Sequence, residues 1–303
     1  MCAGTLSNPT PPITPQRGGL MAARPGPTLR RRKLVKELTA ARTAAGMSIR
    51  QLAAEIDLQP GTLSKIEGGK QGLTVRNIKA IGRASGLSKA KIDQLVLLAA
   101  DDDNNSDWLV EFREDIPEWF ELYPKLEQDA DEIWSYGSEL PHGLVQTPAF
   151  AEVLARITFP DLADEQRRRS VDLRTARQAI LEQEHPTGLK IVLNEAVIRR
   201  PIGDEEVMRE QLRHLLSLSE RPNIDIQVLP FSAGAHPGMK TGFNLLRFPE
   251  GFDDMDCVYL ENANGSVWQE RPEDVAHYSD VFTRLQVQAL SGDETRDLLG
   301  SLT

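Results

Sequence analysis

The stretch MSIRQLAAEIDLQPGTLSKIEGGK, residues 47–70, decides the fold of the N-terminal part of this chain. It predicts two short helices joined by a tight turn. Ser48 stands where a helix N-cap belongs, and Pro60 stands in the first turn of the second helix, where its missing N–H costs nothing. Asp57 occupies the turn, and the pair Gly68-Gly69 ends the second helix. This is the layout of a helix-turn-helix, whose second helix lies in the DNA major groove.

Apolar residues at helical spacing separate an inner face from an outer face on both helices. The outer face of the second helix is left with Thr62, Lys65 and the backbone of Gly61, with Gln59 near the helix start. Lysine can donate to guanine O6 and N7, and threonine can touch a thymine methyl, so these side chains are expected to read bases. Flanking cations are expected to contact phosphates. The expected DNA-binding residues are Ser48, Arg50, Gln59, Gly61, Thr62, Lys65, Lys70 and Arg76.

The distribution of charge favours the same interpretation. Residues 28–98 hold 14 Lys or Arg and 5 Asp or Glu, a net charge of +9, whereas residues 99–303 hold 19 and 40, a net charge of −21. The total of −10 therefore hides a basic module of DNA-binding size attached to an acidic body. That body should repel phosphate and help to orient the basic face towards DNA.

The window closely resembles the XRE family, the Cro and C1-type repressors, through Ser48, Leu52-Ala53, Leu63-Ser64, Ile66-Glu67 and Gly69-Lys70. The resemblance implies a five-helix, lambda-repressor-like all-α fold that binds double-stranded DNA. It also implies a structural ion pair, because Arg42 matches the family arginine that pairs with the glutamate at Glu67. Asp57 departs from the usual turn glycine. An ordinary helical hairpin is disfavoured, since it has no need for the polar outer face or the Ile-Glu-Gly-Gly-Lys ending.

Segments rich in proline, glycine or acidic residues divide the chain and predict a multidomain protein. Residues 1–27 are rich in proline and glycine and are expected to form a disordered tail, residues 28–98 the helix-turn-helix domain, residues 99–107 an acidic linker, and residues 108–303 a larger α+β domain. A first helix is expected over residues 29–45. The cations at its start, residues 30–33, oppose the helix dipole, so we expect them to contact phosphate. Further helices are expected after caps at Thr74 and Ser88.

The larger domain shows helical and strand patterns in alternation. Aromatic residues recur at helical spacing between Trp108 and Tyr123, and are expected to form core. Short apolar or alternating runs bounded by turn residues predict strands. The expected strands are 189–194, 224–229, 243–248 and 258–260, and the expected helices are 162–183, 204–219 and 273–290. The pattern therefore predicts an α+β domain whose strands come late in the sequence, in an order that the sequence does not reveal.

This domain resembles the C-terminal module of actinobacterial, WhiJ-like and antitoxin-like regulators. The residues that carry the resemblance are residues 142–151, Arg174, Arg177-Gln178, residues 194–196, residues 230–236 and residues 258–261. Members of that group sit beside a gene for a small protein, which implies a protein partner. With the helix-turn-helix, the resemblance covers about residues 28–300.

Glu195, His236 and Glu261 are the candidate ligand or partner site, since two carboxylates and an imidazole fall near strand ends or loops. The small-residue loop 230–238 could close over a ligand. Structural roles are favoured, with Glu195 and Glu261 paired to Arg199, Arg200 or Arg174; ligand binding is the second interpretation and catalysis a distant third. The sequence contains no nucleophile elbow, phosphate loop or dinucleotide fingerprint, so we expect neither catalytic residues nor a cofactor.

Composition sets further limits. Two cysteines and five histidines without ligand spacing predict no disulfide framework and no metal site, which favours a reduced cytoplasm. No apolar run approaches the roughly 18–20 residues that cross a bilayer. We therefore predict a cytoplasmic, non-enzymatic transcriptional regulator, acting as a homodimer paired mostly beyond residue 107, whose C-terminal domain senses a partner protein or small ligand. The alternative is an antitoxin that neutralises a small partner protein and represses its own operon.

Overall fold

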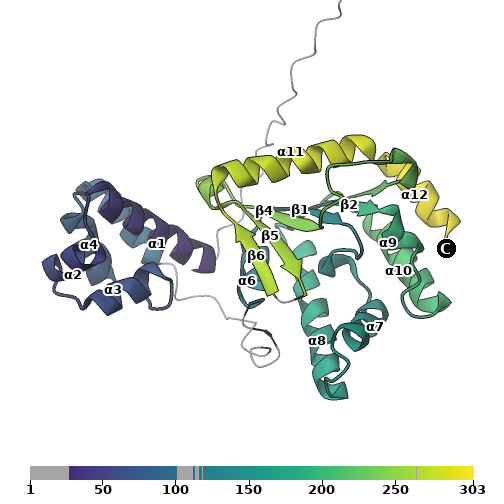
Figure 1. Ribbon diagram of the computed structural model, residues 1–303, viewed down its shortest axis with the longest axis horizontal. Helices are drawn as coiled ribbons and strands as arrows, with labels where there is room; N and C mark the ends of the chain where they lie inside the picture. Colours follow the sequence, from purple (N-terminus) through teal and green to yellow (C-terminus); the bar gives the residue numbers. More distant parts are fainter. Residues whose placement is uncertain (1–26, 101–111, 113–115, 118, 264) are drawn as a thin grey trace, which may run out of the picture.

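A computed structural model describes residues 27–100, 112, 116–117, 119–263 and 265–303. The predicted tail and most of the predicted linker lie outside the described residues. Figure 1 shows a small helical domain beside a larger sheet-containing domain. The predicted multidomain fold class, an all-α domain followed by an α+β domain, is confirmed.

Five helices build the N-terminal domain: α1 (Pro27–Ala44), α2 (Ile49–Glu55), α3 (Pro60–Glu67), α4 (Val75–Ala84) and α5 (Lys89–Ala100). Thr74 and Ser88 accept hydrogen bonds from backbone N–H groups in the first turns of α4 and α5, which caps these helices. The apolar stripes meet in one core, formed by Leu34, Leu38, Leu52, Ala53, Leu63, Ile78, Ile81 and Leu95. The described structure thus buries the inner faces predicted for α2 and α3.

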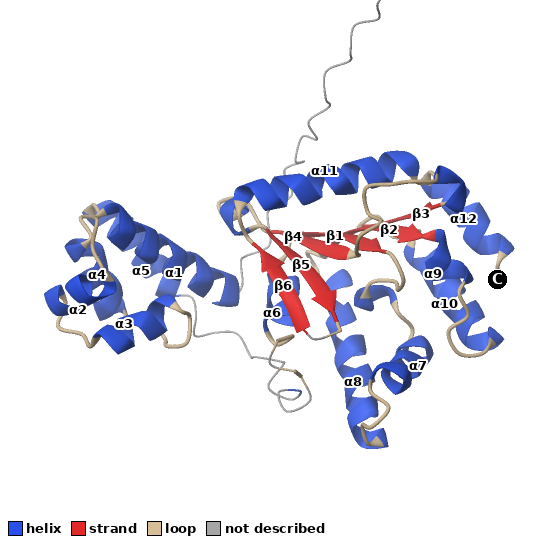
Figure 2. Cartoon of the chain, viewed as in Figure 1, coloured by secondary structure: helices blue, strands red, loops and turns tan. Residues whose placement is uncertain are grey.

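The sheet of the C-terminal domain is mixed and has the strand order β3-β2-β1-β4-β5-β6. Its strands are β1 (Glu132–Gly137), β2 (Gly188–Asn194), β3 (Ile224–Leu229), β4 (Phe243–Arg247), β5 (Cys257–Asn262) and β6 (Gly265–Gln269). Strands β1, β2 and β3 are parallel, whereas β4 pairs antiparallel with β1 and continues through β5 to β6 (Figure 2). The carboxyl ends of β1, β2, β3 and β5 therefore lie along one edge.

Helices cover both faces of this sheet. The helices are α6 (Leu122–Asp129), α7 (Pro148–Thr158), α8 (Asp164–Arg177), α9 (Glu195–Arg199), α10 (Glu205–Leu218), α11 (Pro272–Gln288) and α12 (Gly292–Ser301). Helix α11 packs on one face through Val281, Phe282 and Leu285, against inward residues such as Tyr136. The other face packs against α6, α9, α10 and α12 through a larger core that includes Ile133. Because side chains alternate along a strand, neighbouring residues of β1 enter different cores.

Three features of the domain correct the sequence-based expectations. The prediction that strands come late is wrong, because β1 begins at residue 132 and is a central strand, between β2 and β4. It was missed because it follows the aromatic helical pattern, and Ile133, Trp134 and Tyr136 fit either periodicity. Strand β6 was also missed. The helix predicted over residues 162–183 is instead α8 followed by the 3-10 turn η4 (Gln178–Leu181).

Candidate DNA-binding surface and C-terminal polar cluster

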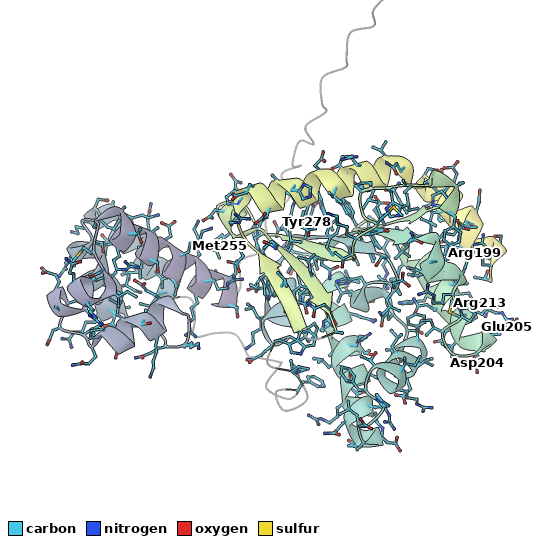
Figure 3. The ribbon with its side chains drawn as sticks, viewed as in Figure 1. Arg199, Asp204, Glu205, Arg213, Met255 and Tyr278 are labelled. Carbon is cyan, nitrogen blue, oxygen red and sulfur yellow. The ribbon has the colours of Figure 1, made fainter. Side chains whose placement is uncertain are left out.

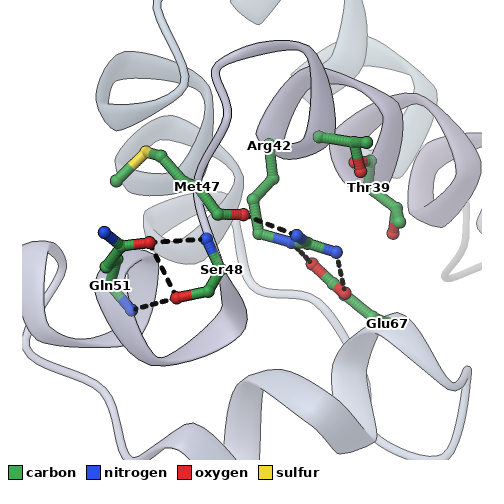
Figure 4. Close-up of polar contacts among 7 residues, drawn as sticks. Thr39, Arg42, Met47, Ser48, Gln51 and Glu67 are labelled. Atoms are coloured by element: carbon green, nitrogen blue, oxygen red, sulfur yellow. Dashed lines mark hydrogen bonds and ion pairs between the residues drawn. The ribbon is translucent and has the colours of Figure 1, made fainter.

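The N-terminus of α2, where the helix-turn-helix begins, is fixed by a reciprocal cap. The Ser48 hydroxyl accepts the backbone N–H of Gln51 at 3.3 Å, and the Gln51 side-chain oxygen accepts the Ser48 backbone N–H at 2.9 Å (Figure 4). This capping box satisfies two amides that the first turn of α2 would otherwise leave unpaired. The hydroxyl of Ser48 is therefore engaged at the N-terminus of α2, while the residue itself is exposed.

The turn between α2 and α3 depends on Asp57, whose φ of +54° makes it the only non-glycine residue with positive φ among those described. Left-handed backbone is strained for most side chains but is tolerated by aspartate. Pro60 is the first residue of α3. At the other end, Gly69 has φ +68° and lets the Lys70 N–H reach the Lys65 carbonyl at 2.8 Å, which closes α3.

Helix α3 buries Leu63 and Ile66 at 0% and 2% exposure, so its opposite face points to solvent. Lys65 is exposed there, and Thr62 is half-buried one turn earlier. The remaining predicted contact residues, Arg50, Gln59, Gly61, Lys70 and Arg76, are all exposed. The described surface around α3 thus carries four cations, those of Arg50, Lys65, Lys70 and Arg76, and a set of polar side chains. This composition is suited to a groove flanked by phosphates.

Arg42 and Glu67 lie together between the end of α1 and the end of α3 (Figure 4). Arg42 donates through Nε and Nη2 to the two carboxylate oxygens of Glu67, at 2.6 and 2.9 Å, and through Nη1 to the Met47 carbonyl at 2.7 Å. The hydrogen bond to Glu67 raises the pKa of Arg42, against the opposing effect of burial. The fork-to-fork geometry fixes the position of α3 on α1.

The cations at the start of α1 have partners that the sequence did not suggest. Arg32 pairs with Glu270, and Lys33 pairs with Asp254, both in the C-terminal domain. Arg31 instead donates to the Gly69 carbonyl at 2.9 Å, at the end of α3. Carboxylates and a carbonyl of the same chain therefore occupy the places where we had expected phosphate. The sequence could not reveal the pairs with Glu270 and Asp254, because these carboxylates lie more than two hundred residues from their cations.

The candidate residues of the C-terminal domain lie on different elements. Glu195 begins α9 and accepts the backbone N–H of Phe231 at 2.7 Å and Nε of Arg199 at 2.5 Å. Burial alone would raise the pKa of Glu195, but these two bonds outweigh it and lower the pKa. The carboxylate therefore ties the start of α9 to the chain that leaves β3, as the structural interpretation would require.

His236 lies in the loop between β3 and β4, against the end of β1. Its ring packs edge-on against Tyr136, with 5.8 Å between centroids, and burial lowers its pKa. In the same loop, a Cβ on Gly238 would lie 2.6 Å from the Tyr136 ring, so only glycine permits this approach. The loop predicted to close over a ligand thus rests on Tyr136.

Glu261 is exposed at the end of β5, within the electrostatic influence of Arg174 and Arg177. No hydrogen bond or ion pair among the described residues joins Glu195, His236 and Glu261 to one another. The three residues that the sequence grouped as one candidate site therefore serve separate parts of the described structure.

A buried polar cluster beneath β5 was not predicted. Arg177 of α8 donates through Nε and Nη2 to both oxygens of Glu127 on α6, at 2.7 and 2.8 Å, and the two residues are 6% and 1% exposed. The guanidinium also lies over the rings of Phe120 and Tyr123, at 5.2 and 5.5 Å from their centroids. A charge this deeply buried is tolerated because it is paired and stacked.

His142 joins this cluster through Tyr123. Its Nδ1 accepts the Leu144 N–H at 3.3 Å, so the neutral ring carries its proton on Nε2, which lies 2.8 Å from the Tyr123 hydroxyl oxygen. Burial lowers the pKa of His142 to about 4; Glu127 opposes the shift, whereas Arg177 and Arg174 reinforce it. The imidazole is therefore neutral at physiological pH and acts as a fixed hydrogen-bonding group.

Glutamine side chains attach the chain around His142 to the neighbouring helices. Gln178 donates to the Gln146 carbonyl at 2.7 Å, Gln211 donates to the Val145 carbonyl at 2.7 Å, and Arg174 pairs with the Gln146 side-chain oxygen. Several residues that carried the resemblance in this domain, from 142 to 178, thus meet in one network. These residues come from different elements, so no spacing within one helix or strand could have predicted the network. The order of the family-like residues along the sequence was the only signal of it.

Side chains suited to a metal ion do not cluster in the described part of the chain: no group of three or more His, Cys, Asp or Glu residues is found there. Cys257 is a buried free thiol whose pKa burial raises to about 12. No described helix has the length and apolar character needed to cross a membrane.

A capped helix pair with an exposed polar second helix, set on an α+β domain, defines a helix-turn-helix protein. Residues 33–95 match the family described as a helix-turn-helix domain. Residues 120–301 match the family described as a domain of unknown function, DUF5753, and the chain belongs to that family. Neither the curated proteins nor the solved structures include a match to this chain.

Proposed function

We propose that this protein is a sequence-specific, XRE-type transcriptional regulator that binds double-stranded DNA in the cytoplasm as a homodimer. One observation carries the proposal: the exposed face of α3 presents Lys65 and Thr62 opposite the buried Leu63 and Ile66. A recognition helix needs this division, with an apolar side that fixes it and a polar side that reaches base edges. The match of residues 33–95 to a helix-turn-helix domain supports it.

Replacement of Lys65 tests base reading. Selection of bound sequences from a random DNA pool should yield an operator, and Lys65→Ala should weaken operator binding by about 1–3 kcal/mol and relax the preference at one position. Lys89→Ala is the matched control, because Lys89 is an exposed cation at the start of α5, away from α2 and α3. If Lys65→Ala and Lys89→Ala behaved alike in both affinity and preferred sequence, α3 would not be the reading helix.

The phosphate contacts should behave differently from the base contacts. Loss of Arg50, Lys70 or Arg76 is proposed to weaken operator and scrambled DNA alike, and to reduce the salt dependence of binding by about one ion per contact. Titrations at several salt concentrations would separate the two classes. An operator-specific loss in Arg76→Ala would instead place Arg76 at a base edge.

For the C-terminal domain we propose a role in protein contact and signal reception. The supporting observation is a set of exposed apolar side chains on the loops that follow β1 and β3: Leu140, Phe231 and Met239, at 42%, 59% and 69% exposure. Exposed apolar groups that share one edge of a sheet are typical of interaction surfaces. Glu195 and His236 lie in or beside these loops and belong to the same proposed surface.

The partner remains the point on which the two proposed functions differ. In the regulator, this surface binds a second copy of the chain or a signalling partner; in the antitoxin-like alternative, it neutralises a small protein encoded by a neighbouring gene. Phe231→Asp should disrupt whichever association is present, as measured by ultracentrifugation of the chain alone and with the neighbouring protein. Relief of that protein's toxicity by the chain, lost in Phe231→Asp, would favour the antitoxin.

A further inference from the structure

Helix α1 belongs to both domains. Leu34 and Leu38 contribute to the core of the helical domain, but Leu29, one turn earlier, is 0% exposed and packs in the main core of the C-terminal domain. The backbone N–H of Leu29 donates to the Asp129 carboxylate at 3.1 Å, at the end of α6. This contact satisfies one of the amides that a helix start leaves unpaired. A single continuous helix thus joins the two domains.

Three cations on the next turns of α1 face two carboxylates of the C-terminal domain. Arg32 pairs with Glu270, and Lys33 pairs with Asp254, whose other carboxylate oxygen lies 3.3 Å from Nζ of Lys36. Burial alone would raise the pKa of Asp254, but the bonds to Lys33 and Lys36 lower it. The unfavourable placement of cations at a helix N-terminus is therefore offset by carboxylates across the interface.

Both carboxylates stand on connections of the antiparallel half of the sheet. Asp254 lies in the 3-10 turn η6 (Asp253–Met255) before β5, and Glu270 follows β6. Met255, the next residue, is buried in the same core as Leu29, and Figure 3 labels it beside the first turns of α1. The carboxylates are thus held by the sheet, and the cations are held by α1.

We propose that this contact is a latch that limits DNA binding. When it is closed, Asp254 and Glu270 occupy Arg32, Lys33 and Lys36, and the acidic C-terminal domain is held at a fixed orientation against the start of α1. When it opens, the three cations become available to DNA phosphates and the helical domain can reorient on the duplex. The proposal rests on the proposed DNA-binding function and adds to it a regulatory contact that no predicted site residue provides.

The physical chemistry of the contact suits a reversible latch. Asp254 and Glu270 retain 46% and 51% side-chain exposure, and pairs this exposed have little net stability and are screened by salt. DNA phosphates are negatively charged hydrogen-bond acceptors, as the two carboxylates are, and they form a dense array along the duplex. They can therefore bind the same cations. The three cations can therefore exchange carboxylate for phosphate. Reorientation of the helical domain also requires the first turn of α1, with Leu29, to bend or to leave the C-terminal core.

Zero-length cross-linking of the full-length protein tests whether the latch closes. A carbodiimide joins an amine to a carboxylate only where the two are in contact, so mass spectrometry should find Asp254 joined to Lys33 or Lys36. Saturation with a scrambled duplex should reduce the yield of that cross-link at least threefold, while the cross-link between Lys125 and Glu121, which are 2.8 Å apart within the C-terminal domain, should persist. Absence of the Asp254 cross-link in the free protein would overturn the proposal.

Charge reversal tests whether the latch limits binding. Asp254→Lys should bind scrambled DNA about 3- to 30-fold more tightly at low salt, with a steeper salt dependence of about one to three additional ions. Glu210→Lys is the control, since it makes the same charge change on an exposed residue of α10, which Figure 1 draws on the far side of the sheet domain. Asp254→Asn removes the attraction without repulsion and should show a smaller effect in the same direction, which guards against misfolding of the reversal variant.

Equal gains in Asp254→Lys and Glu210→Lys would mean that net charge alone matters, and would overturn the latch. The proposed function fails in a different way: a protein that forms the Asp254 cross-link but binds no duplex would keep the interdomain contact, and would overturn DNA binding together with the regulatory role of the contact. Tight operator binding without the cross-link would keep the proposed function and overturn the latch alone.

Discussion

The two domains each contain a bidentate Arg–Glu pair, but the two pairs lie at different depths. Arg42 and Glu67 are 14% and 13% exposed and join two helices of a small domain. Arg177 and Glu127 are 6% and 1% exposed, stack on aromatic rings and connect with His142 through Tyr123. The same type of ion pair thus joins two helices near the surface of one domain and forms part of the core of the other. The cost of breaking each pair should follow its depth, because a stranded buried charge has no access to water.

The largest effect is expected from Glu127→Ala, which strands Arg177 in the core. We expect a loss of about 3–5 kcal/mol in the unfolding free energy of the C-terminal domain. All four tryptophans lie beyond residue 107, so tryptophan fluorescence during urea unfolding reports on this domain alone. Glu152→Ala, which removes only an exposed pair with Arg156, should change stability by less than about 1 kcal/mol. Equal effects of the two variants would show that burial does not set the cost.

Glu67→Ala should have a smaller effect, about 2–3 kcal/mol, because Arg42 keeps the Met47 carbonyl and some contact with water. The loss should appear in the far-ultraviolet circular dichroism of the helical domain and leave the tryptophan transition in place. Glu55→Ala, at an exposed position on α2, is the control. A shift of the tryptophan transition by Glu67→Ala would mean that α1 transmits the loss to the C-terminal domain.

The two domains should also respond differently to acid. The pKa of His142 is lowered to about 4 in the folded protein, so between about pH 6.5 and 4 the unfolded chain binds more protons and folding stability falls as pH falls. We expect a loss of about 1–3 kcal/mol over this window, confined to the tryptophan transition, because all five histidines follow residue 141. His142→Asn should flatten that dependence. An unchanged slope in His142→Asn would assign the acid sensitivity to other groups, either His214 and His236, whose pKa values are also lowered, or the carboxylates.

The smallest effect concerns the turn of the helical domain. Asp57→Gly should stabilise that domain by about 0.5 kcal/mol, since glycine adopts φ +54° without strain but loses more entropy on folding. The far-ultraviolet transition would measure it, with Asp93→Gly as a destabilising control inside α5. Destabilisation by Asp57→Gly would show that the aspartate side chain stabilises the turn by more than the strain of its positive φ costs.

Local signals predicted the helical domain well because its determinants lie close together in sequence. Ser48, Asp57 and Pro60 each act within a few residues, and the structure places them at the cap, the turn and the first helical position. The candidate site of the C-terminal domain was less accessible. Glu195, His236 and Glu261 share an edge of the sheet but make separate contacts, because strand order decides which strand ends meet.

The polar cluster around Arg177 could not be inferred for the same reason. Its ion pair spans 50 residues and its members come from α6, α8 and the chain before η3 (Gly143–Val145). No periodicity connects such residues. The interdomain contact of α1 was harder still to predict from the sequence, because cations at the start of a helix can bind phosphate as well as carboxylate.

Burial of Leu29 has a consequence for synthesis on the ribosome. The first turn of α1 is made early among the described residues, yet Asp129 follows Leu29 by 100 residues, and Glu270 follows Arg32 by 238. At about 5–20 residues per second, some 10–50 s separate the birth of the helix from that of its last partner. During this interval the nascent helical domain can complete its own core. Leu29 is then exposed to solvent, and the cations at the start of α1 lack their carboxylate partners. We therefore expect each new molecule to pass through a basic, partly apolar intermediate, which matures only when the last strands of the chain have been made.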